Sequence, residues 1–263
     1  MRRHLAVSRA QAADLIEAGR VHVSGAVAEK ASRLVGPGEP ISIPGPPSRF
    51  VGRGGEKLDA ALSRFDIVPE GLRALDAGAS TGGFTDCLLQ RGATSVCAVD
   101  VGRGQIHERL RYHPRVDVRE KTDIRAVRLA DVGGVPFDLV VADLSFISLR
   151  TVAAALANLA KAQGDVVVLI KPQFEAGRVE ASRGKGVIRD PGVWRQAVMG
   201  AIGAFDAAGA AMMGVMVSPL RGADGNVEFL AHLRPGSDAA TLLSERGLDV
   251  EQALAEAAGE QGS

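Results

Sequence analysis

Four polar residues stand at the edges of otherwise apolar segments and could together perform acid–base chemistry. Asp143 ends the apolar run 139–142, and Lys171 directly follows the apolar run 166–170. An unpaired ammonium group at the end of a buried strand is costly, so Lys171 is expected to have carboxylate partners. A lysine whose pKa is lowered by burial and by a second ammonium group can accept a proton from a weak nucleophile. The complete set is Lys57, Asp143, Lys171 and Glu228.

A small-residue turn over residues 75–84 predicts a site for a cofactor. Glycines let a ligand lie directly against the backbone, and the free N–H groups at the start of the next helix form a polar cradle. The dinucleotide pattern G-x-G-x-x-G does not fit, because Ser80 replaces its second glycine. A D-x-G-x-x-x-G-G pattern fits better and favours S-adenosylmethionine, with an ordinary strand–helix turn as the alternative. The residues expected to bind its methionine end are Asp76, Gly78, Ser80, Gly82, Gly83 and Phe84.

Two further acidic residues follow the next two strands. Asp100 ends the apolar segment 96–99, which suits a carboxylate that accepts both ribose hydroxyls of an adenosyl cofactor. Asp123 could bond the adenine amino group, and a helix N-cap is an equally good interpretation. Because a nicotinamide-dinucleotide enzyme uses an acid in the place of Asp100, that residue does not choose between the two cofactors.

The four polar residues resemble the K-D-K-E tetrad of ribose 2′-O-methyltransferases of the FtsJ class. The surrounding segments are similar to the TlyA family, which is often labelled haemolysin but consists of ribosomal-RNA 2′-O-methyltransferases. The resemblance runs from Ser8 to about residue 235 and implies methyl transfer from S-adenosylmethionine to the ribose of cytidine in ribosomal RNA. The matching segments are 52–58, 76–86, 143–149, 170–175 and 222–228.

The chemistry of such a transfer suits these residues. The sulfonium methyl group is already activated, so no metal is expected, and the enzyme must mainly align the reactants and remove a proton. On this hypothesis Lys171 is the base, Asp143 orients it, and Glu228 holds Lys57 and the incoming ribose. An ordinary structural salt bridge is the alternative for each residue taken alone.

The order of apolar and helical segments predicts the elements that position these residues. Continuous apolar strands separated by helices favour a parallel sheet with right-handed crossovers and a ligand at the carboxyl ends of the strands. The short loop 219–225 suggests that the last two strands are antiparallel. Helices are expected at 81–91, 104–110, 148–162 and 190–208, and strands at 72–76, 94–100, 115–119, 138–143, 165–171, 211–218 and 226–233. The fold class is therefore α/β, a Rossmann-like class I methyltransferase sheet of seven mostly parallel strands.

The N-terminal residues form a separate pattern. Residues 8–25 resemble the S-four-type (alpha-L) RNA-binding fold, which normally begins with a further helix; this chain carries only the end of that helix, so the domain is expected to lack it. We expect this domain at 1–44, a Pro/Gly-rich linker at 45–51 and the methyltransferase domain at 52–263. The side chains expected to neutralise RNA phosphates are Arg3, Arg9, Arg20 and Lys30.

Composition limits the remaining possibilities. The chain has 31 basic and 31 acidic residues, so no global field attracts nucleic acid, although residues 1–57 carry nine Lys/Arg against five Asp/Glu. Cys87 and Cys97 lack metal spacing and are expected to be buried, inert thiols. No apolar run approaches the roughly 18 residues of a membrane span. These features predict a cytoplasmic protein that works on ribosomal RNA, not on DNA or a membrane, and favour a monomer.

Two competing functions make different demands on the sequence. A haemolysin or pore-forming protein needs a membrane-inserting stretch, whereas the apolar segments here are short and spaced as sheet strands. A catalytically inactive RNA-binding protein does not need the complete Lys–Asp–Lys–Glu set. The Gly/Arg-rich segment 175–190 beside Lys171 could clamp the substrate or be a mobile loop.

Overall fold

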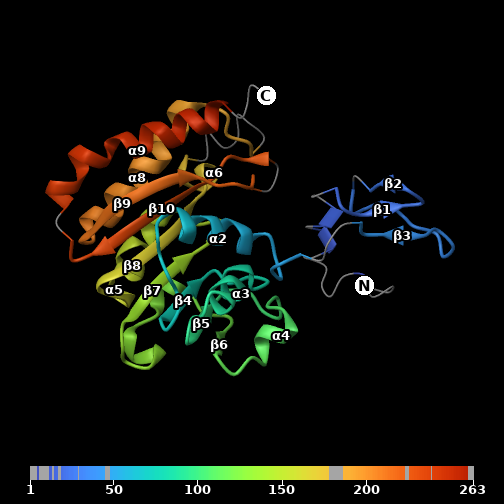
Figure 1. Cartoon of the computed structure of the whole chain (residues 1–263), viewed down its shortest axis with the longest axis horizontal. Helices are drawn as coiled ribbons and strands as arrows, with labels where there is room; N and C mark the ends of the chain where they lie inside the picture. The colour runs from blue at the N-terminus through green and yellow to red at the C-terminus, as the bar shows by residue number, and fades with distance from the viewer. Residues whose placement is uncertain are drawn as a thin grey trace.

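The computed structural model describes residues 5, 12–13, 15–16, 19–28, 30–44, 48–177, 186–222, 225–237 and 239–259. A seven-stranded sheet in the order β6-β5-β4-β7-β8-β10-β9 forms the centre of the larger unit (Figure 1). Its strands are β4 (Arg73–Ala77), β5 (Ser95–Val99), β6 (Val116–Arg119), β7 (Phe137–Ala142), β8 (Ala160–Ile170), β9 (Ala210–Val217) and β10 (Phe229–Pro235). The helices are α2 (Gly54–Arg64), α3 (Gly83–Gln90), α4 (Glu108–Arg111), α5 (Ala153–Leu159), α6 (Pro172–Glu175), α8 (Pro191–Ala207) and α9 (Ala239–Gly259).

The strand directions follow the predicted fold. Strands β6, β5, β4, β7 and β8 pair in parallel, whereas β10 is antiparallel to both β8 and β9. The α/β class with a mostly parallel seven-stranded sheet is confirmed, as is the antiparallel pairing of the last two strands. Strand β10 inserts between β8 and β9, so the chain leaves the edge of the sheet and returns toward its centre.

Helices cover both faces of the sheet because its strands are apolar on both sides. Val140, Val166 and Val168 pack with residues of α5, α8 and α9, while Leu139 and Val167 pack with residues of α2 and α3. Alternate residues of one strand therefore contribute to two separate cores. The loops at the carboxyl ends of the parallel strands carry the polar residues.

Several boundaries differ from the predictions. The segment expected to be one helix over 148–162 contains a short 3₁₀ turn (Leu149–Thr151) and α5, and β8 already begins at Ala160. Ala and Lys favour a helix locally, but Ala160 pairs with Phe137 of β7, and tertiary pairing outweighs that small preference. The last strand begins at Phe229, so Glu228 lies immediately before the strand and not within it.

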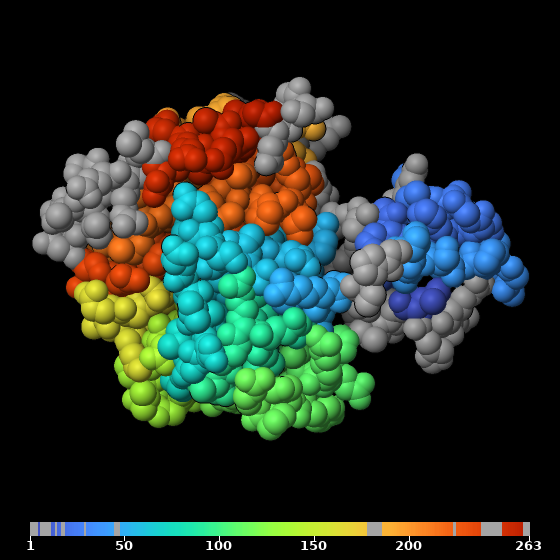
Figure 2. Space-filling model, viewed as in Figure 1, coloured from blue at the N-terminus to red at the C-terminus, as the bar shows by residue number. Residues whose placement is uncertain are grey.

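The N-terminal residues contain a small antiparallel sheet in the order β2-β1-β3, and Figure 2 shows these residues (blue) as a body beside the larger unit. Its strands are β1 (His22–Val23), β2 (Ala26–Val27) and β3 (Ile41–Ser42). Ser24 and Gly25 connect β1 and β2 with positive φ angles of 50° and 83°, as a tight two-residue hairpin turn requires. Before this sheet, residues 12–13 and 15–16 are helical, and the other residues from 6 to 18 lie outside the described part of the chain.

Candidate active site

The four polar residues form two ion pairs at the carboxyl ends of the central strands. Lys171 follows β8 and Asp143 follows β7, and the Lys171 Nζ lies 2.6 Å from the Asp143 Oδ1. Lys57 of α2 pairs with Glu228, with 2.5 Å between the Lys57 Nζ and the Glu228 Oε2. The structure therefore brings all four predicted catalytic residues to one region, as two pairs.

The Lys57–Glu228 pair is almost completely buried. Lys57 is 6% exposed and Glu228 is 3% exposed. Gly222 leaves the space that the Glu228 carboxylate occupies, because a Cβ at this position would lie 2.1 Å from the Glu228 Oε1. Removing one member would leave the other charge buried and uncompensated, which is strongly destabilising. The pair is thus a fixed wall of the site.

The Lys171 ammonium group has a second acceptor that the sequence analysis did not identify. The Lys171 Nζ donates a hydrogen bond to the Ser145 Oγ over 2.9 Å, and it lies 5.8 Å from the centre of the Phe174 ring. Ser145 is exposed, so Lys171 sits between a partly buried carboxylate and a group at the protein surface. Lys171 thus contacts both a carboxylate and a hydroxyl group.

A cavity of about 550 Å³ opens beside the Lys171–Asp143 pair. This volume lies within the usual range of small-ligand sites. Its walls come from the loops that follow β4, β5, β6 and β7, and Asp143 lines it. Predicted cofactor-binding residues that line this large cavity are Gly78, Ser80, Asp100 and Asp123.

A smaller cavity of about 160 Å³ adjoins the first one, since Gly78, Ser80 and Asp143 line both. Lys57, Gly83 and Phe84 also line the smaller cavity. The two ion pairs are therefore connected by a polar hollow that could receive the acceptor group and one end of a cofactor.

Asp100 organises the turn after β4. Its Oδ2 accepts a hydrogen bond from the Ser80 backbone N–H over 2.8 Å, and its Oδ1 accepts one from the Gly102 N–H over 2.6 Å. Asp123 caps a short 3₁₀ turn by accepting the Arg125 N–H, as the N-cap interpretation expects, and it also lines the large cavity. The Arg125 side chain beside it lowers the pKa of Asp123.

Asp76 and Gly82 lie behind the cavity walls and line neither of the two cavities. Asp76 is completely buried, and its Oδ2 accepts a hydrogen bond from the Thr85 Oγ1 over 2.6 Å. Its Oδ1 has no hydrogen-bond partner among the described residues, and burial raises the pKa of Asp76 to about 7. Asp76 thus supports the start of α3 from beneath.

Gly78 and Gly82 meet conformational demands that other residues would not. Gly78 has a φ of 86°, and a Cβ there would lie 2.4 Å from the Asp143 carbonyl oxygen. Gly82 is the N-cap of α3 with a φ of 97°, and a Cβ there would lie 2.3 Å from the Leu110 Cδ1. The turn can therefore approach β7 and α4 closely only with glycine at these positions.

Two further residues near Lys171 were missed in the sequence. Phe146 is 91% exposed, has a φ of 65°, and lies 5.2 Å from Phe174 between ring centres. Glu175 is 5% exposed and accepts hydrogen bonds from the Ser148 Oγ over 2.5 Å and the Leu149 N–H over 2.7 Å. The only signal in the sequence was their position beside Asp143 and Lys171.

The predicted RNA-binding residues are described in part. Lys30 is exposed, and the Arg20 guanidinium reaches the Pro44 carbonyl oxygen over 3.5 Å. Arg3 and Arg9, as well as Arg178, Arg183 and Lys185 of the Gly/Arg-rich segment, lie outside the described residues.

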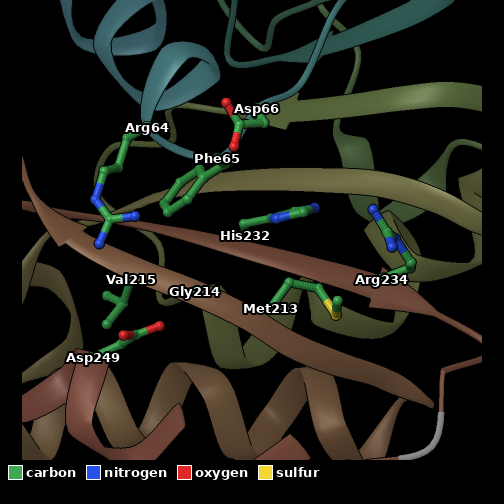
Figure 3. Close-up of a pocket in the computed structure, with 9 residues that line it drawn as sticks. All are labelled: Arg64, Phe65, Asp66, Met213, Gly214, Val215, His232, Arg234 and Asp249. Carbon is green, nitrogen blue, oxygen red and sulfur yellow. The ribbon is translucent and has the colours of Figure 1, made fainter.

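A separate hollow of about 290 Å³ lies among α2, β9, β10 and α9 (Figure 3). Gly214 contributes to its floor, and its charged side chains include Arg64, Asp249 and Arg234. His232 and Arg234 both bond Asp165 over 2.8 Å. The hollow shares no lining residue with the two cavities beside Lys171.

The described ranges contain neither a metal-binding cluster nor a membrane-spanning helix. No group of three His, Cys, Asp or Glu side chains among these residues is arranged to hold a metal ion. In the same part of the chain, no helix combines the length and apolar character that crossing a membrane requires.

Comparisons with known proteins agree with this architecture. The family described as FtsJ-like methyltransferase matches residues 50–235, and the S4 domain family matches residues 2–41. A Mycobacterium tuberculosis protein named 16S/23S rRNA (cytidine-2'-O)-methyltransferase TlyA is 46% identical over 259 residues, covering 97% of this chain and 95% of the relative. The chain belongs to the TlyA family.

Other TlyA-family relatives carry a different name. Hemolysin A of Brachyspira hyodysenteriae is 37% identical over 225 residues, an alignment that covers 86% of this chain and 93% of that protein. The solved structure of a Streptococcus thermophilus protein, also named as a hemolysin, has a TM-score of 0.77 and 35% identity, covering 100% of this chain and 96% of that one. The label and the methyltransferase fold thus occur together within the TlyA family.

Proposed function

We propose that this protein transfers a methyl group from S-adenosylmethionine to the 2′-hydroxyl of a cytidine in ribosomal RNA. The observation that carries the proposal is the Lys171–Asp143 pair at 2.6 Å, placed where the ligand-sized cavity adjoins the smaller cavity that Lys57 lines. The M. tuberculosis relative named for this reaction supports the choice of ribosomal RNA and cytidine.

The cavities suit the cofactor in size and in chemistry. Asp100 and Asp123 both line the large cavity, which supports their assignment to the ribose hydroxyls and to the adenine, respectively. The glycine turn and the smaller cavity then receive the methionine end near Gly83 and Phe84. When bound, S-adenosylmethionine supplies a methyl group that its sulfonium charge has already activated.

The residues of the chain then have to orient the ribose and remove one proton. Lys57, held by Glu228, donates a hydrogen bond to the ribose and fixes its position. Lys171 in its neutral form accepts the proton of the 2′-hydroxyl, and Asp143 holds the resulting ammonium group. Ser145, which already bonds Lys171, offers the path by which the proton returns to solvent.

Phe146 supports the same function from the rim of the cavity. A phenylalanine that is 91% exposed loses the benefit of burial, and stacking on a base would recover it. Phe146 lies one residue from Ser145 and three from Asp143, so a base stacked on its ring would place the attached ribose near Lys171. We assign Phe146 as the platform for the target base.

The two units divide the work between them. Residues 1–44 would bind RNA through phosphate contacts from Arg3, Arg9, Arg20 and Lys30, and residues 52–263 would carry the chemistry. Such a protein would work in the cytoplasm on assembled or partly assembled ribosomal subunits.

The test is methyl transfer from labelled S-adenosylmethionine to separated small and large ribosomal subunits, followed by mapping of ribose-methylated nucleotides. A 2′-O-methyl cytidine in either subunit supports the proposal and identifies the target. Cofactor binding without transfer to either subunit would contradict the substrate, and absence of cofactor binding would contradict the whole proposal.

A further inference from the structure

An open hollow of about 360 Å³ lies between α3 and α4, apart from the two cavities of the active site. We call it the α3–α4 hollow. Leu89 and Leu110 lie at its base, where they are 7% and 1% exposed and belong to the core, so the groups that a ligand can reach are those of the rim. The full lining is Asp86, Leu89, Gln90, Arg109, Leu110, His113 and Arg115.

The rim of the α3–α4 hollow is basic. Asp86 is buried and already accepts hydrogen bonds from the Val51 N–H over 2.9 Å and from Arg109 over 2.5 Å. Arg115 is exposed, and its Nη1 donates to the Ala93 carbonyl oxygen over 2.8 Å, which fixes the side chain without neutralising it. Because Asp86 is buried, the charged groups that reach the surface are the guanidinium groups of Arg109 and Arg115.

The hollow also adjoins the connection between the two units. Gln90, which lines it, donates a hydrogen bond to the Arg49 carbonyl oxygen over 3.0 Å, and Asp86 holds the Val51 N–H of the same segment. In Figure 2, the residues that follow the linker (light blue) and the surface around α4 (green) lie on the same side of the larger unit. A ligand held by the N-terminal unit can continue onto this surface.

We infer that the α3–α4 hollow is a second contact site for single-stranded RNA, outside the site of methyl transfer. Arg115 and Arg109, both exposed at the rim of the hollow, bind backbone phosphates of the RNA. This inference rests on the proposed function, because it assumes that RNA is the substrate. It extends the bound length of RNA from the N-terminal unit along the side of α3.

The test measures how the binding of ribosomal subunits depends on salt. Arg115→Ala removes one phosphate contact, so the slope of log affinity against log salt should fall by about 0.7 to 0.9. Between 50 and 200 mM salt, the ratio of parent to variant affinity should therefore shrink by about threefold. Arg115→Lys should keep the parent slope, because it keeps the charge.

Two further variants serve as controls. Arg115→Gln is neutral but keeps a donor for the Ala93 carbonyl, so it should reproduce the slope of Arg115→Ala even if the alanine variant loses stability. Arg195→Ala removes an exposed arginine that pairs with Glu251 on the distant α8–α9 surface, and should leave the slope unchanged. Affinity for S-adenosylmethionine should stay at the parent value in every variant.

Two results would overturn the inference. If Arg115→Ala and Arg115→Gln both keep the parent slope of log affinity against log salt, no phosphate binds here. A weaker affinity with an unchanged slope would show that the hollow instead packs against protein. If the parent protein itself does not methylate ribosomal subunits, the proposed function fails first, so the two failures can be told apart.

Discussion

At the scale of single residues, this protein depends on charged groups whose partners are supplied by the fold. Lys171 has both Asp143 and Ser145, while Lys57 has Glu228 in an almost dry environment. Asp76 differs, because it is buried without a cationic partner in contact, and its pKa is raised to about 7. These environments give the residues different tasks, which substitutions can separate.

Replacing Lys171 by Ala should slow methyl transfer by about 10²- to 10⁴-fold, the usual contribution of a general base. S-adenosylmethionine should still bind, because Lys171 does not line the cofactor cavity. Single-turnover methyl transfer and calorimetric titration of the cofactor measure the two effects. Lys161→Ala is the control, because Lys161 pairs with Asp138 at the opposite end of β8. Parent transfer rates in Lys171→Ala would rule out the assigned role.

Asp76 should make stability depend on pH. Burial raises its pKa from 3.8 to about 7, so the folded protein binds one more proton than the unfolded chain between these values. The contribution of Asp76 to the free energy of unfolding therefore falls as pH rises from about 4 to 7. Asp76→Asn should remove this component. The free energy of unfolding of the variant minus that of the parent should therefore be larger at pH 8 than at pH 5. Thermal unfolding across that range checks this, and a constant difference would contradict it.

At the scale of elements, short connections hold the ends of strands and helices in place. The turn between β4 and α3 fits against β7 and α4 only through Gly78 and Gly82. Glu175 at the end of α6 accepts two hydrogen bonds from residues 148 and 149 and so ties the loop after Asp143 to the helix after Lys171. These local contacts connect the loops that carry Asp143 and Lys171 to the rest of the sheet edge.

Gly82→Ala should destabilise the protein by about 1 to 3 kcal/mol, since it combines a positive φ with a collision against Leu110. Gly104→Ala separates the two causes. Gly104 also has a positive φ, of 69°, but a Cβ there would meet nothing within 4 Å, so only about 1 kcal/mol is expected. Chemical denaturation of both variants compares the costs. Equal losses would mean that Leu110 simply moves aside.

Glu175→Ala should cost about 1 to 3 kcal/mol, because it leaves the buried Leu149 N–H without an acceptor. The loosened loop should also raise the KM for ribosomal subunits, since it carries Phe146. Glu175→Gln, which keeps one acceptor oxygen, should recover part of both losses. Glu251→Ala, at an exposed ion pair with Arg195, should change stability by less than about 0.5 kcal/mol. An unchanged KM in Glu175→Ala would argue against this coupling.

At the scale of the whole molecule, RNA binding and chemistry are assigned to different units. The N-terminal unit contains exposed Lys30, in the connection between β2 and β3, and the larger unit contains both ion pairs and both cavities. The segment between them is anchored at Asp86 and Gln90 on α3. A defect in RNA binding should therefore be separable from a defect in catalysis.

Lys30→Ala should weaken the binding of ribosomal subunits, because it removes about one phosphate contact. The slope of log affinity against log salt should therefore fall by about 0.7 to 0.9. The rate of transfer at saturating subunit concentration and the affinity for S-adenosylmethionine should not change. Filter binding at several salt concentrations, together with saturation kinetics, tests both statements. A lower saturating rate with unchanged affinity would assign Lys30 to the chemical step instead.

The sequence by itself determined the class of fold and the identity of the polar residues. Apolar strands alternate with helical segments, and this local pattern is sufficient for a parallel sheet. The glycine turn after β4 also follows from local spacing. Because carboxyl ends of parallel strands share one edge, the approach of Lys171 to Asp143 could be expected from their positions after β8 and β7.

Only the tertiary structure decided how these residues pair and which are exposed. Lys57 and Glu228 are separated by 171 residues, and their contact depends on the insertion of β10 between β8 and β9. Asp76 lies beneath the turn and Phe146 projects into solvent, although their local sequences do not distinguish these environments. Burial and partner choice result from packing between distant segments, and this is why residue spacing identified the four polar residues but not their arrangement.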